Sequence, residues 1–237
     1  MLVAASTLRR CTIALALLSV ATAVPAEGTE PFGLATVAVA QGTLPAAWRQ
    51  LQSEMQAEAR IIAQCRAAPK ACPLPAALRF IAIADEGNHH EGLARIGHIN
   101  RAVNLAIAVP GGGTVQPAWR SPLHALAGGS GDCKQYAVVK YAALVDSGVA
   151  ADDLRLVIVR IRQTRNPQAE PSDHALVAVR LAADWIILDN RSLAMIPSRQ
   201  LLDRYMPLFA LDHRGVRQFV QLSRPNAGAA PCAESAG

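Results

Sequence analysis

The residues with the clearest chemical potential form a short polar stretch at the start of a long apolar segment. A glycine-rich loop ends at Gly131, and Asp132 and Cys133 follow it directly. Asp132 suits the N-cap of a helix over 133–147, and Gln135, three residues later, completes a capping-box pattern. Cys133 would then lie in the first helical turn, where free backbone N–H groups and the helix dipole favour a thiolate. The pattern predicts a nucleophilic cysteine, and the alternative is a small buried apolar residue.

A histidine and an aspartate follow at the ends of two strand-like runs. His174 opens a run through Leu181, and Asp189 closes a second run just beyond it. Short β-rich runs so closely spaced predict a hairpin. If two residues form its loop, Leu181 pairs with Asp184, and His174 and Asp189 share a face within reach of each other. A three-residue loop would instead turn Asp189 to the opposite face.

Together these side chains form a set that suits covalent catalysis. Cys133 would be the nucleophile, His174 its base, and Asp189 the group that orients the histidine. Taken singly, His174 could be a strand-end histidine and Asp189 a turn former. The order helix, strand, strand for the three residues favours an α+β fold, with N-terminal helices packed on an antiparallel sheet. The apolar, β-rich run 154–161 predicts a central strand of that sheet.

Further motifs accompany the three residues. In chain order they are Val103-Asn104, Trp119-x-x-Pro122-Leu123, Gly131-Asp132-Cys133, Tyr136-Ala137, Lys140-Tyr141, Asp173-His174 and Leu188-Asp189-Asn190-Arg191. With these motifs, the chain from about Pro75 to Phe219 resembles the bacterial transglutaminase-like cysteine peptidases, which include the LapG-like periplasmic proteases that release surface adhesins. The resemblance implies a transglutaminase/papain-like fold and gives Cys133, His174 and Asp189 the triad roles.

The resemblance also implies partners and a substrate-binding set. It indicates a protein substrate, an exported adhesin in this group, and a membrane-bound regulatory receptor. It assigns Trp119, Asp173 and Asn190 to substrate binding, although a core aromatic residue is the alternative for Trp119. Two other interpretations of the chain stay open. One is acyl transfer to an amine by the same triad, as in a transglutaminase or amidase, and the other is a non-catalytic binding module that has kept the fold.

The residues after the cysteine depart from the family pattern. Characterised members have acidic residues there and use neighbouring carboxylates to bind calcium. This chain has Lys134 and Gln135 instead and keeps only Asp132, which is a weak calcium candidate. A calcium ion takes six to eight oxygen ligands, and an ammonium group beside it repels it. We therefore expect no metal and no cofactor, with Asp132 as the nearest partner for the Lys134 ammonium.

The first residues predict export. Within 1–26, Arg9 and Arg10 precede a short apolar run, and Val24-Pro25-Ala26 offers a small-residue cleavage site, as in a secretory signal peptide. The apolar run is too short to span a bilayer. The whole chain carries a formal net charge of +5, and loss of the two arginines lowers it to about +3, which does not favour nucleic acid as a partner. We expect a periplasmic protein with no integral membrane segment in its mature chain.

The remaining boundaries come from composition. Residues 27–44 predict a loose lead-in, 45–223 the transglutaminase-like cysteine peptidase domain, and 224–237 a disordered tail. Cys65 and Cys72 flank the end of the first helical pattern. In an exported protein this pair favours a disulfide, and a zinc site is the weaker alternative.

Three histidines form a separate group of possible metal ligands. His89, His90 and His98 lie close together in the sequence, among polar neighbours such as Asn88 and Arg95. These neighbours favour a solvated face, and no carboxylate–histidine framework is evident from the sequence. We therefore expect no metal site there.

Overall fold

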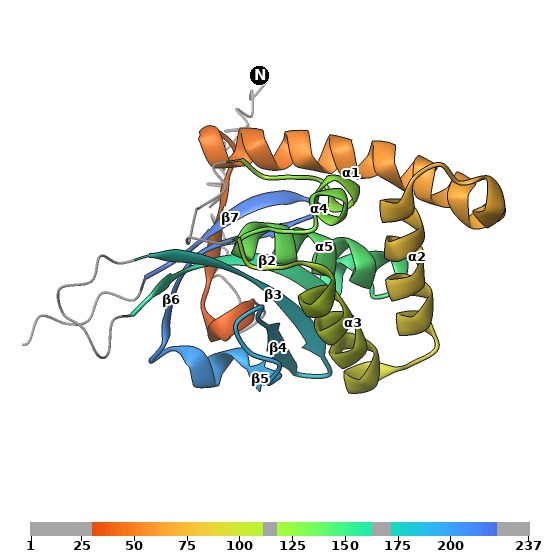
Figure 1. Cartoon of the computed structure of the whole chain (residues 1–237). Helices are drawn as coiled ribbons and strands as arrows, with labels where there is room; N and C mark the ends of the chain where they lie inside the picture. The colour runs from red at the N-terminus through yellow and green to blue at the C-terminus, as the bar shows by residue number, and fades with distance from the viewer. Residues whose placement is uncertain (1–29, 111–117, 163–171, 222–237) are drawn as a thin grey trace, which may run out of the picture.

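The computed structural model describes residues 30–110, 118–162 and 172–221. Within them, a layer of helices covers one face of a twisted antiparallel sheet (Figure 1). The α+β fold expected from the sequence is confirmed. The predicted signal peptide, 1–26, and the predicted tail, 224–237, lie outside the described residues and stay predictions.

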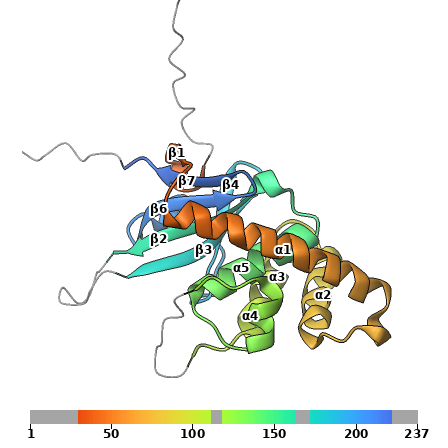
Figure 2. The ribbon, with the colours of Figure 1, turned by 90° about the horizontal axis from the view of Figure 1, so that it is seen from above.

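The helical layer is built almost entirely before the sheet in the sequence. It contains α1 (Thr43–Ala67), α2 (Pro75–Asn88), α3 (Gly92–Ala106), α4 (Pro122–Gly128) and α5 (Cys133–Asp146). The first helix begins beside the sheet and runs outward to α2 (Figure 2). No helix in the described residues is both long enough and apolar enough to cross a membrane.

The sheet has seven strands in the order β1-β7-β6-β2-β3-β4-β5, with every neighbouring pair antiparallel. Its strands are β1 (Thr36–Val39), β2 (Leu154–Ile161), β3 (Asp173–Leu181), β4 (Asp184–Leu188), β5 (Ile196–Pro197), β6 (Tyr205–Asp212) and β7 (Gly215–Phe219). The predicted strand 154–161 is confirmed as β2, the middle strand of the sheet. Its side chains alternate between two apolar clusters, with Leu154 and Leu156 facing the helices and Val157 and Val159 facing the opposite side.

Helix α5 lies at the centre of the helical layer and contacts β3 and β2 of the sheet. Because both the sheet and the other helices cover it, it is apolar around most of its circumference, and residues such as Val138, Val139 and Leu144 are fully buried. A helix held on all sides gives its first residue a fixed position relative to the sheet. That first residue is Cys133.

The N-terminal edge of the sheet departs from expectation. Residues 36–39, inside the predicted loose lead-in, form the edge strand β1 and pair with β7 from Thr36↔Phe219 to Val39↔Val216. The prediction of a loose lead-in was wrong for this segment, and α1 begins at Thr43 rather than Pro45. Four residues carry little pattern of their own. The free edge of β7, which comes last in the fold, gives them their partner.

The corner between α1 and α2 is closed covalently. Cys65, in the last turn of α1, and Cys72, after the short 3₁₀ turn Pro69–Ala71, form a disulfide with a Cα–Cα distance of 4.8 Å. The predicted pairing is confirmed. Among the described residues, the remaining free cysteine is Cys133.

Candidate active site

The local sequence places Cys133 at the start of α5 through a capping box. Asp132 is the N-cap, and its Oδ1 accepts a hydrogen bond from Lys134 N at 3.0 Å. In return, Asp132 N donates to Gln135 Oε1 at 3.1 Å. The predicted helix start is confirmed, with Cys133 as the first helical residue and its thiol partly exposed. Its backbone N–H is one of the groups at a helix N-terminus that have no partner within the helix.

The loop in front of the cysteine is also fixed. Gly131 N donates to Ala108 O at 3.0 Å, and Ala108 N donates to Gly129 O at 2.9 Å, so the loop is tied to the segment that leaves α3. A Cβ atom on Gly131 would lie 2.6 Å from Gln135 Cβ. A glycine is therefore required at this position if Gln135 is to reach back and complete the capping box.

The β3–β4 hairpin brings the histidine and the aspartate together. Leu181 pairs with Asp184 across a two-residue loop, which is the register predicted from the sequence. The pairing continues to Val177↔Leu188, so Asp189 follows directly on the far side of the last pair. His174 Nε2 lies 2.9 Å from Asp189 Oδ1, and both side chains are buried. The predicted contact between these two residues is confirmed.

The Cys133 thiol, which belongs to the helical layer, forms a hydrogen bond with His174 of the sheet. Burial raises the pKa of the Cys133 thiol. The hydrogen bond with His174, the charge of His174 and the backbone N–H of Ala175 all lower it. Their combined effect is larger, so the pKa lies below its ordinary value. For His174, burial lowers the pKa, but Asp189 and Cys133 outweigh it and raise the pKa to about 9. These two directions favour a thiolate–imidazolium pair.

Asp189 is held by more donors than the sequence suggested. Its Oδ1 also accepts from Arg191 N at 2.9 Å, and its Oδ2 accepts from the Tyr205 hydroxyl at 2.8 Å. Asn104 Nδ2 on α3 donates to the Asp189 backbone carbonyl at 3.1 Å. Burial raises the pKa of this carboxyl, but His174 and the other donors overcome it and hold the pKa at about 2. The group is therefore an anion at neutral pH.

Tyr205 was missed in the sequence because it comes from β6, two strands away from β3. Its ring stacks on the His174 imidazole with a centroid distance of 6.2 Å while its hydroxyl reaches Asp189. No local motif connects a tyrosine at 205 with a histidine at 174. Only the order of strands in the sheet brings them together.

Lys140 is a second residue whose relation to the site the sequence did not reveal. Its side chain is 1% exposed, and its ammonium nitrogen has no hydrogen-bond partner among the described residues. Burial lowers the pKa of Lys140 to about 7, against the opposing attraction of the Asp189 carboxylate. It lies about two turns along α5 from Cys133, so the same helix carries the predicted nucleophile and a buried amine that the Asp189 carboxylate attracts.

A cleft of about 260 Å³ opens on the thiol and the imidazole. Asp173 and Asn190, which the resemblance assigns to substrate binding, both line it. Asp173 also forms an exposed ion pair with Arg160, with 2.9 Å between Oδ1 and Nε. Trp119 is not among the described residues that line the cleft. It is partly buried against the helical core, as in the alternative considered for it.

The residues around the cysteine do not offer a calcium ion the ligands it needs. Lys134 Nζ lies 2.6 Å from Asp132 Oδ2, so a cation already neutralises this carboxylate, and the pairing expected from the sequence is confirmed. Gln135 uses Oε1 in the capping box and donates from Nε2 to Ala118 O at 3.0 Å. One ion-paired carboxylate and one occupied amide fall far short of a cage of six or more oxygens. This donor set does not fit calcium.

Comparison with known proteins identifies the family. The family described as "Bacterial transglutaminase-like cysteine proteinase BTLCP" matches residues 53–217, which is more than half of the chain. The chain belongs to this family. The resemblance drawn from the motifs around Cys133, His174 and Asp189 is confirmed, and this proteinase is a cysteine peptidase of the BTLCP type. No curated protein matches the chain.

Solved structures similar to this BTLCP proteinase include calcium-bound LapG of Legionella pneumophila, with 18% identity, a TM-score of 0.54, and coverage of 68% of this chain and 91% of that one. A second LapG structure from the same organism is 19% identical with a TM-score of 0.54, over 66% and 87% of the two chains. An EGTA-treated form is 19% identical with a TM-score of 0.53, over 69% and 85%. At these identities the likeness shows that the proteinase shares the fold of LapG.

Proposed function

We propose that the chain is a periplasmic cysteine endopeptidase that cleaves protein substrates through a thioester intermediate. Cys133 is the nucleophile, His174 the general base and acid, and Asp189 the group that orients the imidazole. The observation that carries this proposal is the continuous chain of contacts from the partly exposed thiol through His174 to the buried Asp189, at the floor of an open cleft.

In the first step, the Cys133 thiolate attacks the carbonyl carbon of the scissile peptide bond. The negative charge then moves to the carbonyl oxygen, and the Cys133 backbone N–H at the N-terminus of α5 is positioned to donate to it. His174 gives its proton to the leaving amine as the C–N bond breaks. The products of this step are a free amine and a thioester on Cys133.

In the second step, water resolves the thioester. His174, now neutral, takes a proton from water as its oxygen attacks the thioester carbonyl. The carbon–sulfur bond then breaks, the acid product leaves, and the thiolate–imidazolium pair is restored. Asp189 binds Nε2 of the imidazole, which leaves Nδ1 as the nitrogen that faces the thiol and handles the proton in both steps.

Asp189 supports both steps by fixing the imidazole. Three donors besides His174 hold this residue in place: Arg191 N and the Tyr205 hydroxyl bind its carboxylate, and Asn104 binds its backbone carbonyl. A carboxylate held in this way stabilises the imidazolium without taking its proton. The carboxylate also selects the tautomer of His174, because an anion accepts a hydrogen bond only from a protonated ring nitrogen.

The predicted signal peptide supports the proposed location and substrate class. The signal-peptide pattern of 1–26 and the Cys65–Cys72 disulfide both suit an oxidising compartment outside the cytoplasm. By family likeness, the proposed substrate is an exported adhesin and the proposed partner a membrane-bound receptor that regulates access to it. We propose that the reaction needs no calcium, because Lys134 pairs with Asp132, the carboxylate that directly precedes the cysteine.

The test uses the purified mature chain with a labelled unfolded protein and a labelled primary amine. Endopeptidase function predicts new N-termini in the protein, with little of the amine incorporated. A transglutaminase would attach the amine instead, which would overturn the proposal. A binding module would do neither, and its Cys133 would not react with a thiol reagent at a rate that follows thiolate ionisation.

A further inference from the structure

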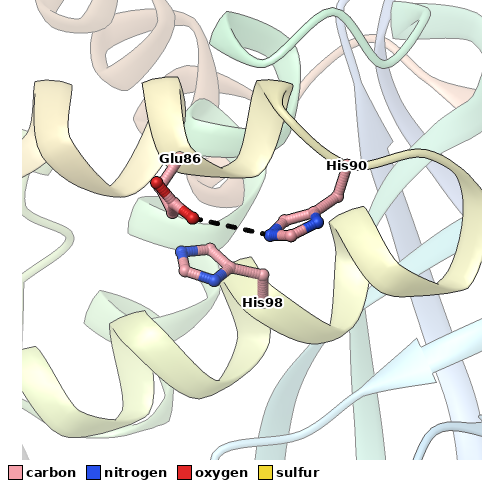
Figure 3. A group of neighbouring side chains, drawn as sticks. All are labelled: Glu86, His90 and His98. Carbon is pink, nitrogen blue, oxygen red and sulfur yellow. Dashed lines mark ion pairs between the residues drawn. The ribbon is translucent and has the colours of Figure 1, made fainter.

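The turn between α2 and α3 brings three metal-binding side chains together, far along the helices from the cysteine. Glu86 lies in the last turn of α2, His90 in the connection that follows, and His98 in the second turn of α3. One ligand atom from each lies within 4.8 Å of the other two, and no other such group of His, Cys, Asp or Glu occurs in the described residues. Figure 3 shows the carboxylate and both imidazoles pointing into one shared space.

Glu86 is the ligand of this group that was not considered from the sequence. Glu86 Oε1 lies 3.6 Å from His90 Nε2, which is the i,i+4 spacing of a helix. The His98 ring lies beside the His90 ring with a centroid distance of 5.5 Å and a tilt of 36°. The sequence-based expectation of a solvated face without a metal considered the histidines without Glu86, and it stays a prediction. Because α3 folds back on α2, His98 joins the Glu86–His90 pair at the end of α2.

The spacing is close to that of a first coordination shell. Ligand atoms bound tetrahedrally at about 2.0–2.1 Å from a zinc ion lie about 3.4 Å apart. The Glu86–His90 pair is already near this value, and the ligand atoms of all three residues lie within 4.8 Å of one another. The backbone at the turn is held, since Arg95 Nε donates to His90 O at 2.8 Å. Glu86 is exposed and both histidines are partly buried, so an ion can enter from solvent.

We propose that Glu86, His90 and His98 bind one divalent transition-metal ion of the zinc type, with water as the fourth ligand. Two imidazoles and one carboxylate suit zinc, cobalt or nickel better than calcium or magnesium, which prefer oxygen ligands alone. The ion would join α2 to α3 and stabilise the helical layer. Its role is structural, and the site is separate from the peptidase chemistry.

The experiment measures zinc binding by isothermal titration on the chelator-stripped mature chain in a Cys133→Ser background, because a thiolate beside a histidine can itself bind zinc. We expect one zinc ion per chain, no heat with calcium, and a rise in the thermal unfolding temperature with zinc. His98→Ala and Glu86→Gln are expected to weaken binding strongly and to abolish this rise. Cobalt is expected to give the intense visible absorption of a four-coordinate ion, lost in His98→Ala.

The matched control is His213→Ala. His213 is also a surface histidine beside a carboxylate, 3.5 Å from Asp152 Oδ1, but within the described part of the chain it belongs to no group of three ligands. This variant should bind zinc as the parent does. The proposal is overturned if His98→Ala binds zinc as tightly as the parent, if His213→Ala weakens binding equally, or if the parent binds no zinc. Circular dichroism of each variant shows that a lost signal is not lost folding.

Discussion

Two aspartates flank the catalytic groups, and the protein treats them in opposite ways. Asp189 lies under the imidazole, buried and surrounded by donors from three directions, and its pKa is about 2. Asp132 lies at the rim of the cleft, where it caps α5 and pairs with the Lys134 ammonium. A buried anion that fixed donors hold can orient a catalytic base. Asp132, whose charge the Lys134 ammonium neutralises, can still cap α5, but it attracts a calcium ion only weakly.

The largest expected effect follows from substitution of the proposed nucleophile, Cys133. Cys133→Ser replaces the thiolate with a hydroxyl that His174 cannot activate to the same degree. We expect the cleavage rate to fall by about 10⁵–10⁶-fold, a loss of the size seen when a triad nucleophile is removed. Because sulfur and oxygen differ little in size, the thermal unfolding temperature should change by only a few degrees. A variant that kept full activity would show that Cys133 is not the nucleophile.

The same substitution at the two aspartates tests the comparison directly. Asp189→Asn removes the anion that orients and charges His174, and we expect kcat/KM to fall by about 10⁴-fold. Asp132→Asn keeps an effective N-cap and should cost less than about 1 kcal/mol of stability and less than tenfold in rate. Equal losses in the two variants, from peptide-cleavage kinetics, would contradict the division of roles.

The pH dependence of cleavage reports the histidine that Asp189 supports. The rate should rise as the Cys133 thiol ionises, below the ordinary thiol pKa, and fall above about pH 9, where the imidazolium that protonates the leaving amine is lost. Alkylation of Cys133 needs only the thiolate and should stay fast above pH 9. In Asp189→Asn the alkaline limb should move to lower pH, because the anion that raises the histidine pKa is absent. An unmoved limb would assign it to another group.

Lys140 is buried, as Asp189 is, and it should affect the stability of the fold in a pH-dependent way. Its pKa is about 7 in the folded chain, against 10.5 for an ordinary lysine, so folding disfavours its charged form. This lowers the free energy of unfolding. The loss is absent above about pH 10.5, grows as pH falls toward 7, and is then on the order of 4 kcal/mol. Lys140→Met should therefore be more stable than the wild type at pH 6, by denaturant unfolding, and should lose this advantage as pH rises to 10.

The matched control is Lys134→Met, which removes a partly exposed lysine from the same helix. The same gain at pH 6 in this variant would mean that the effect is general to α5 and not due to burial of Lys140. Cleavage rates of Lys140→Met give a second readout. Loss of the ammonium removes an attraction on Asp189, so a modest fall in rate should accompany the gain in stability.

The smallest effect is expected at the rim. Because Lys134 neutralises Asp132, wild-type cleavage should survive a calcium chelator within about twofold. Lys134→Glu places a second carboxylate beside Asp132, and it should weaken activity until calcium is supplied. Cleavage assays of both proteins with chelator and with added calcium decide this. A wild type silenced by chelator and restored by calcium would show that other carboxylates complete a calcium site.

The sequence predicted the features that depend on residues close together in the chain. The capping box around Cys133 lies within four residues, and the hairpin register that joins His174 to Asp189 follows from strand period and loop length. Both were correct. Tyr205 could not be found this way, because it reaches Asp189 only through the pairing of β6 with β2.

The other omissions have the same cause. Strand β1 depends on the free edge of β7, at the far end of the chain, and four residues alone carry too weak a pattern. The four-residue spacing of Glu86 and His90 was readable from the sequence, but His98 joins them only when α3 folds back on α2. Lys140 was visible as the lone charge of an apolar helix. Its electrostatic interaction with Asp189 could not be predicted, because it depends on the packing of α5 on the sheet.

The division of the proposed triad between two layers has a mechanical consequence. The thiol belongs to α5 in the helical layer, whereas the imidazole and the carboxylate belong to adjacent strands of the sheet. The distance over which the proton moves is therefore set by the thickness of the apolar packing between the layers. Removal of one methyl group from the core between the layers, as at the buried Val138 of α5, is expected to alter the gap between sulfur and nitrogen without touching either atom. In the proposed mechanism, the reaction rate therefore depends in part on the packing of the hydrophobic core.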